Sequence, residues 1–211
     1  YLGYLHALNI AKLKQDTLDH LTTISLITAA EHKQIQEGAR QLLIALSTNQ
    51  SLKSKNKFDC QKFLSEIRDS YIRYENFGIV DGQGHVYCAA DLENAELNPP
   101  KQELVLQTLA DQTFTVGTYY AVAPSGSVIN YAFPLNSNQV IYASLSLDWV
   151  SEFVNSLNTD DQLVINILDK NGTVLARSPK SDTSIGQNFV TDPLVKEILQ
   201  KGSGQSTKLG I

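Results

Sequence analysis

Apolar residues in the first part of the chain, residues 1–48, recur at helical spacing, and this stretch contains no proline. Five of them fall on one stripe of a helix: Ile35, Ala39, Leu42, Leu43 and Leu46. At a rise of ~1.5 Å per residue such a helix is about 70 Å long, which exceeds the ~30 Å width of a small domain. Part of it is therefore expected to project or to pair with another helix. Two helices with a break near Thr22 and Thr23 are the alternative.

The middle of the chain has the pattern of mixed helices and strands. A second helix is expected after the polar stretch 47–57, with Asp59 as its N-cap and one apolar face made of Cys60, Phe63, Leu64 and Ile67. An Asp-Gly-Gln-Gly turn at 81–84 between two apolar runs predicts a β-hairpin. The expected elements that follow are a loop at 91–100, a helix at 101–110, strands at 114–122, 128–133 and 140–147, and a helix at 149–157.

The pattern then starts again, because residues 167–175 repeat the register of residues 79–87. A loop, a helix at 193–200, a Gly-Ser-Gly turn and a polar strand ending near Gly210 parallel residues 97–117. This order indicates two copies of one unit, with chance similarity of two Asp/Gly hairpins as the alternative. The second copy has room for one strand after its helix, where the first has three. It is either incomplete here or reduced in size, and the predicted fold class is α+β.

Composition and charge exclude several classes of protein. The chain has 211 residues and a net charge of −5, which argues against a nucleic-acid partner. No stretch approaches the roughly 18 apolar residues of a membrane span, and no signal peptide is seen, so the sequence is interpreted as an excised soluble fragment. Two cysteines and four histidines are too few for a structural zinc cluster. The sequence contains no nucleophile motif and no phosphate loop, so no catalytic residue, metal or cofactor is predicted.

The two cysteines, Cys60 and Cys88, lie on the apolar face of the second helix and in the adjacent hairpin strand. A disulfide between them would close a loop of 28 residues and stabilise the fold by about 3 kcal/mol in the chain-entropy model. Such a bridge requires an oxidising compartment. Two buried free thiols are the alternative.

Tyrosine is abundant in the strands of the first unit, and small or polar residues share faces with it. Because side chains alternate along a strand, Tyr119 lies on the face of Ala121, Asn130 on that of Ala132, and Ser144 on that of Ser146. These positions predict a cavity lined by hydroxyl and amide groups, suited to a small polar ligand. The candidate residues from this pattern are Tyr119, Asn130, Tyr131, Ser144 and Ser146. A sheet whose polar face simply meets solvent is the alternative.

Taken in order, these motifs resemble double Cache sensor domains, the extracytoplasmic parts of many bacterial receptors. The segments that carry the resemblance are Cys60–Leu64, Tyr74–Asp81 with Gly84, Val86 and Cys88, Phe114–Tyr119, Ala132–Pro134, Leu147–Trp149, Ile167–Arg177 and Asp192–Val195. The helix and hairpin cysteines make the chain similar to sensors fused to diguanylate cyclases or histidine kinases.

The resemblance implies a layout and a function. It implies a long helix and linker at 1–57, a membrane-distal PAS-like unit at 58–157 and a partial membrane-proximal PAS-like unit at 158–211. An unknown small molecule would bind between the distal sheet and segment 91–110, which adds Gln102 to the candidate ligand-binding residues. Helices outside this sequence would anchor the protein to the inner membrane, with this part in the periplasm or outside the cell. A homodimer through the N-terminal helix is expected to pass the signal to a cytoplasmic output domain. The alternative is that the apolar stripe of this helix faces its own domain.

The sequence differs from the amino-acid-binding members of that family at two of their ligand-binding motifs. Their Asp-Arg signature is matched here by the stretch 101–105, Lys-Gln-Glu-Leu-Val, and their final-strand Asp by Ser146. The Arg that would hold the carboxylate and the Asp that would hold the ammonium in those members are thus absent, which argues against a free amino acid as ligand. The alternative functions are a non-ligand-binding structural, dimerisation or adhesion module and, with weaker support, a small hydrolase.

Overall fold

The computed structural model describes residues 2–53, 56–122, 126–157, 164–179 and 184–201. Two compact units are present, Tyr1–Gly38 and Ala39–Ile211. Helix α1 runs without interruption from Leu2 to Ser47, so the alternative with a break near Thr22 and Thr23 is wrong. Three residues of the predicted apolar stripe that belong to the second unit are buried: Ala39, Leu43 and Leu46.

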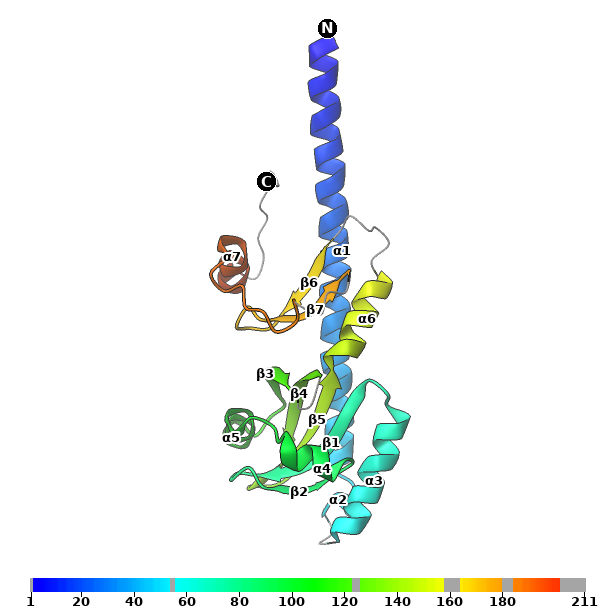
Figure 1. Cartoon of the computed structure of the whole chain (residues 1–211), viewed down its shortest axis with the longest axis vertical. Coiled ribbons are helices and arrows are strands. Elements are labelled where there is room, and N and C mark those ends of the chain that lie inside the picture. The colour runs from blue at the N-terminus through cyan, green and yellow to red at the C-terminus, as the bar shows by residue number, and fades with distance from the viewer. Residues whose placement is uncertain (1, 54–55, 123–125, 158–163, 180–183, 202–211) are drawn as a thin grey trace. The chain divides into compact units, whose positions relative to one another are not determined.

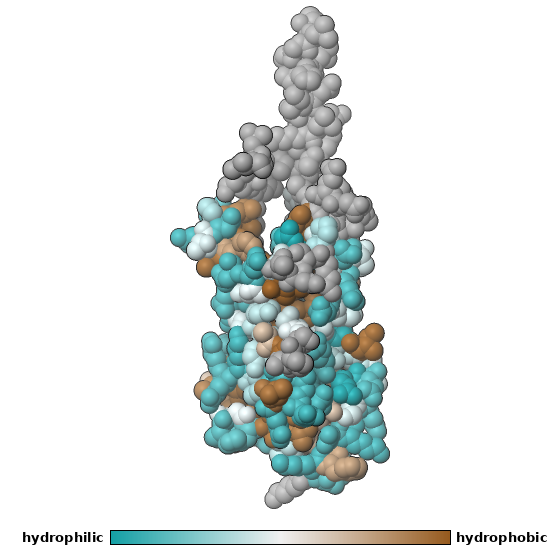
Figure 2. All heavy atoms as spheres, in the orientation of Figure 1, coloured by the Kyte–Doolittle hydropathy of each residue, from teal (hydrophilic) through white to brown (hydrophobic). Residues whose placement is uncertain are grey.

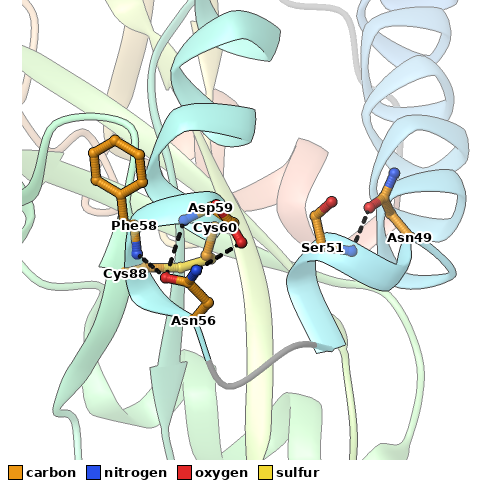
Figure 3. Close-up of a disulfide and its surroundings, with 7 residues drawn as sticks. All are labelled: Asn49, Ser51, Asn56, Phe58, Asp59, Cys60 and Cys88. Atoms are coloured by element: carbon orange, nitrogen blue, oxygen red, sulfur yellow. Dashed lines mark hydrogen bonds between the residues drawn. A yellow bond between two sulfur atoms is a disulfide. The ribbon is translucent and has the colours of Figure 1, made fainter.

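Two short helical segments precede the sheet of the second unit, α2 (Gln50–Lys53) and α3 (Lys57–Ser70). The N-cap of α3 is Asn56 and not Asp59, which corrects the sequence-based prediction. The side-chain oxygen of Asn56 accepts hydrogen bonds from the backbone N–H groups of Phe58 and Asp59, at 3.0 and 3.5 Å (Figure 3). Its amide donates to the Asp59 carboxylate at 2.7 Å, so Asp59 supports the cap from within the first turn.

A five-stranded antiparallel sheet is the centre of this unit, with strand order β2-β1-β5-β4-β3 (Figure 1). Its strands are β1 (Tyr74–Asp81), β2 (Val86–Ala89), β3 (Thr115–Ala121), β4 (Ser127–Pro134) and β5 (Gln139–Ser146). The hairpin and the three later strands are thus confirmed. Between β2 and β3 lie two helices, α4 (Leu92–Leu97) and α5 (Gln102–Asp111).

Helix α4 corrects the loop that was expected over residues 91–100. Asp91 caps it, because its carboxylate accepts a hydrogen bond from the backbone N–H of Asn94 at 3.0 Å. The helix is six residues long, with three apolar positions, and so short a segment does not establish a helical period in the sequence.

Both faces of the sheet are buried, and α3 and α5 lie on opposite sides of it (Figure 1). The face toward α5 forms a hydrophobic cluster of Val80, Leu104, Val105, Ala132, Val140 and Tyr142. The other face carries buried residues that include Phe77, Ile79, Ile141 and Leu145. On the side of the molecule drawn in Figure 2, hydrophilic residues predominate and hydrophobic residues form small separate patches.

The repeated hairpin is also present, as β6 (Ile165–Leu168) and β7 (Val174–Ser178), after helix α6 (Leu147–Leu157). Helix α7 (Pro193–Lys201) follows.

Asp81 and Asp169 hold the two hairpin turns in the same way. Asp81 Oδ1 accepts from the backbone N–H groups of Gln83 and His85, both at 2.9 Å. Asp169 Oδ1 accepts from those of Asn171 and Thr173, at 2.8 and 2.9 Å. The predicted Gly-Ser-Gly turn and final strand lie outside the described residues.

The predicted bridge between the two cysteines is present, with the Cα atoms of Cys60 and Cys88 6.3 Å apart (Figure 3). It ties the first turn of α3 to the end of β2. Both cysteines are buried, so the alternative of two buried thiols was right about burial and wrong about the bond.

Candidate functional site

A hollow lies at the α5 side of the five-stranded sheet. Its empty space, including the part open to solvent, is about 380 Å³. Helix α5 and the residue before it, strands β3 and β4, and the turn between β6 and β7 supply its walls. The lining residues are Lys101, Glu103, Leu104, Gln107, Val116, Gly117, Thr118, Tyr120, Asn130 and Lys170.

Strand register determines which side chains reach this face. Asn130 pairs with Ser144, and Val128 pairs with both Ser146 and Tyr120, so these residues share one side of the sheet. A register shift on β3 between Val116 and Tyr119 changes the alternation there. As a result Tyr120, and not Tyr119, lines the hollow.

Lys101 stands at the start of α5 and has its ammonium group at the wall of the hollow. Lys101 Nζ donates hydrogen bonds to Thr118 Oγ1 at 3.1 Å and to the backbone carbonyl of Tyr119 at 2.9 Å. It also lies 5.8 Å from the centre of the Tyr120 ring, within cation–π range. Lys101 therefore links α5 to β3 and places a positive charge at the site.

Gly117 lets β3 approach its neighbours closely at the floor of the hollow. A β-carbon at this position would lie 2.9 Å from the carbonyl oxygen of Asn130 and 3.3 Å from Leu104. Any other residue would require the backbone of β3 or β4 to shift.

The Asn130 and Ser144 side chains meet beside the hollow, with Ser144 Oγ donating to Asn130 Oδ1 at 2.6 Å. Both residues are buried, at 4% and 8% exposure. Ser144 also lines a second, smaller hollow toward α4, of about 260 Å³ including its open part. Its other lining residues are Glu75, Asn76, Asn94, Asn98, Val122, Val128 and Tyr142. The hydrogen bond between Asn130 and Ser144 thus joins a lining residue of the larger hollow to one of the smaller hollow.

Tyr142 contributes a hydroxyl group that is buried and has no hydrogen-bond partner among the described residues. Burial raises the pKa of Tyr142 and keeps this hydroxyl protonated, with a smaller contribution from the charge of Asp91. The hydroxyl is therefore an unused hydrogen-bond donor next to the smaller hollow.

The six residues proposed from the sequence lie at different places. Asn130 lines the larger hollow and Ser144 the smaller one. Ser146 shares their face but accepts a long hydrogen bond from the backbone N–H of Trp149 at 3.5 Å, near the start of α6. Gln102 is exposed in the first turn of α5, and is not among the lining residues of either hollow.

The two tyrosines of that set point away from the hollows. Tyr131 is paired with Ala143 on the opposite face of the sheet, where its ring stacks on Phe114 at 5.7 Å. Tyr119 uses its backbone N–H to donate to Asp169 Oδ2 at 3.2 Å. Its ring lies against Gly186, where a β-carbon would come within 2.7 Å of the ring.

Several lining residues were missed by the sequence analysis. Glu103 and Gln107 are four apart on α5, and Thr118 and Tyr120 are two apart on β3, so the ordinary periods could have indicated them. No periodic pattern in the sequence could have indicated Lys170, because it reaches the hollow from the turn of the second hairpin.

Among the described residues, no cluster of three or more His, Cys, Asp or Glu is placed to hold a metal ion. Within that same part of the chain, no helix combines the length and the apolar character needed to cross a bilayer.

No family model and no curated protein matches the sequence. Solved structures are similar in fold. An extracellular ligand-binding receptor from Desulfohalobium retbaense matches with a TM-score of 0.71 and 14% identity over 88% of this chain. The chain spans 35% of that protein's length.

Two further structures cover most of their own chains. The ligand-binding domain of the Campylobacter jejuni chemoreceptor Tlp3, in complex with L-norvaline, has a TM-score of 0.65 and 14% identity, over 89% of this chain and 79% of that one. The sensor domain of the V. cholerae histidine kinase DctB has a TM-score of 0.64 and 11% identity, over 83% and 71%. The fold expected from the sequence is thereby confirmed.

Proposed function

We propose that this chain, which has the fold of extracellular receptor sensor domains, is the non-enzymatic ligand-sensing part of a transmembrane signalling receptor. The observation that carries the proposal is the hollow at the α5 side of the sheet. It combines apolar walls from Leu104 and Val116 with polar groups from Lys101, Thr118 and Asn130. Ligand sites commonly pair a largely apolar lining with a few convergent polar groups.

The proposed receptor places two units on the outer side of the membrane. Residues 58–157 form the membrane-distal unit that holds the ligand, and residues 158–211 belong to a membrane-proximal unit. The protein is anchored in the inner membrane by helices outside this sequence and faces the periplasm or the cell exterior, which agrees with the disulfide because such bridges persist in oxidising compartments.

The signal is proposed to pass through α1, in a homodimer, to a cytoplasmic diguanylate cyclase or histidine kinase. A ligand can shift the receptor between two states only by its difference in affinity for them. Contacts that change between the states must therefore include groups around the hollow.

A thermal-shift screen of small metabolites tests the proposal. A ligand at about 100 times its Kd adds about 2.7 kcal/mol to the free energy of unfolding, which corresponds to a rise in Tm of about 5–10 °C for a chain of this size. Gln107→Trp places a large side chain at the hollow, and Leu106→Trp is the matched control, because Leu106 is exposed on the same helix and does not line the hollow.

The outcomes separate the candidate functions. A compound that stabilises the wild type and the Leu106→Trp variant, but not the Gln107→Trp variant, supports a ligand sensor that uses this site. Stabilisation retained by Gln107→Trp would place binding elsewhere. A screen with no stabilising compound would favour the structural or adhesion module instead.

A further inference from the structure

The turn between β6 and β7 is attached to the edge strand of the five-stranded sheet through Asp169. This residue is 6% exposed, and both of its carboxylate oxygens accept hydrogen bonds. Oδ1 holds the turn itself, while Oδ2 accepts from the backbone N–H of Tyr119 at 3.2 Å.

The equivalent residue of the first hairpin makes no such link. Asp81 holds its own turn with Oδ1 in the same way, but its Oδ2 lies 3.2 Å from His85 Nδ1, within the same hairpin. The second oxygen of Asp81 thus makes a contact within its own hairpin, whereas that of Asp169 makes one to a strand 50 residues away in the sequence.

A second contact holds the same two parts together. The Tyr119 ring lies against Gly186, which belongs to the segment after β7. The backbone N–H of Gly186 donates a hydrogen bond to the carbonyl of Val174 at 2.9 Å, so this segment is held to β7. Because a β-carbon on Gly186 would come within 2.7 Å of the ring, the approach is close. Tyr119 therefore contacts the second hairpin region through its backbone and through its side chain.

Lys170 follows Asp169 directly and lines the hollow. The charged side chains around the hollow are then two lysines, Lys101 and Lys170, and one carboxylate, Glu103. Lys101 has three N–H donors, of which two are used by Thr118 and the carbonyl of Tyr119. The described lining therefore has an excess of positive charge and donors available to an acceptor.

We propose that the hollow takes a small anionic ligand with a carboxylate group, bound between Lys101 and Lys170, so that the second hairpin supplies part of the binding site. Asp169 is the positioning residue that holds Lys170 at the hollow. The inference rests on the proposed sensor function. It also explains how binding could affect the second hairpin, because a ligand that contacts Lys170 contacts this hairpin directly and needs no rearrangement in the core of the five-stranded sheet.

The positioning role of Asp169 is tested without a ligand, by hydrogen exchange at the Tyr119 amide. Asp169→Asn leaves one oxygen for the turn and replaces the other acceptor by an NH₂ group, so exchange at Tyr119 should rise about tenfold. Asp81→Asn is the matched control, because it makes the same change in the equivalent turn and should leave Tyr119 exchange unaltered. Equal exchange at Tyr119 in the two variants would overturn the positioning role.

The ligand class is tested by titration calorimetry with the sodium salts of acetate, succinate and benzoate, each compared with its neutral amide. At least one carboxylate should bind and its amide should not. Lys170→Gln should weaken that binding about three- to tenfold. Lys196→Gln, at an exposed lysine of α7 that does not line the hollow, should not weaken it.

Each contrary result has a separate meaning. Amides that bind as well as carboxylates would refute the anionic ligand and leave the sensor function standing. Unchanged carboxylate binding in Lys170→Gln would refute the role of the second hairpin. Failure of all three carboxylates would also count against an anionic site, and the metabolite screen then decides separately whether the hollow binds any small molecule.

Discussion

Tyr142 on β5 lies directly over Gly78 on β1, its cross-strand partner. A β-carbon added to Gly78 would come within 2.6 Å of the Tyr142 hydroxyl and of one of its ring carbons. Glycine at position 78 therefore makes the space that the Tyr142 ring occupies. This relationship places the buried Tyr142 hydroxyl beside the smaller hollow.

Gly78→Ala is expected to lower the free energy of unfolding by about 1–3 kcal/mol, the usual cost of adding atoms to a packed core. The measurement is urea denaturation of the wild type, Gly78→Ala, Tyr142→Leu and the double variant. Because leucine lacks the outer ring atoms, Gly78→Ala should cost much less when Tyr142 is replaced by leucine. An equal cost in both backgrounds would show that the two residues do not interact in this way.

Tyr142→Phe is expected to leave the stability unchanged or to raise it by up to about 1 kcal/mol, because it removes a buried hydroxyl that has no hydrogen-bond partner in the part of the chain that the structure describes. Ser144→Ala is the contrasting variant. It removes the donor to Asn130 Oδ1 and should lower the free energy of unfolding by about 1–2 kcal/mol. Urea denaturation of both variants measures these changes, and a clear loss of stability in Tyr142→Phe would reveal a hydrogen bond to this hydroxyl.

Replacing both cysteines by alanine is expected to lower the free energy of unfolding by about 3 kcal/mol, because the 28-residue loop is then open in the unfolded chain. Thermal denaturation with and without a reductant provides the measurement. Reductant should lower the Tm of the wild type and leave that of the Cys60→Ala/Cys88→Ala variant unchanged. An effect of reductant on the variant would indicate a cause other than the bridge.

The carboxylate of Asp81 makes the first hairpin sensitive to acid. Burial opposes its ionisation, but the backbone N–H groups of His85 and Gln83 and the His85 side chain outweigh this and lower the pKa of Asp81. A lowered pKa in the folded state adds stability above the unfolded pKa of about 3.9, and this is lost as the pH falls through the folded value. Asp81→Asn should therefore flatten part of the fall in Tm below about pH 4.

The control for the acid experiment is Asp111→Asn, which removes an exposed carboxylate at the end of α5. Its Tm profile between pH 7 and pH 3 should follow that of the wild type more closely than the profile of Asp81→Asn does. Parallel profiles of the wild type and Asp81→Asn would contradict the assigned role of Asp81.

Elements with a clear period were predictable from the sequence. The stripe of α1, the apolar face of α3 around Cys60 and Leu64, and both Asp/Gly hairpins are local patterns, and the structure contains each of them. The prediction failed where it depended on only a few residues. The α3 cap was assigned three residues too late, and α4 was taken for a loop because its six residues are too few to show a helical period.

Within a regular strand the shared face was also predictable, for Asn130 with Ala132 and for Ser144 with Ser146, because alternation depends on neighbouring residues alone. That Asn130 and the two serines lie on one face of the sheet follows only from the pairing of β4 with β5. Alternation failed on β3. The register shift between Val116 and Tyr119 comes from pairing with β4, and it turns Tyr120 toward the hollow in place of Tyr119.

By itself the sequence determined most of the α+β elements and the repeated Asp/Gly hairpin, since each follows from the spacing of residue types along one stretch of chain. It left Cys60 and Cys88 as either a bridge or two buried thiols, and the structure decided for the bridge. Only the tertiary structure decided which residues surround the hollow. Asp169 meets Tyr119 across 50 positions and Lys170 reaches a wall built by another hairpin. Contacts of this kind arise when packed elements approach in space, and no period along the chain records them.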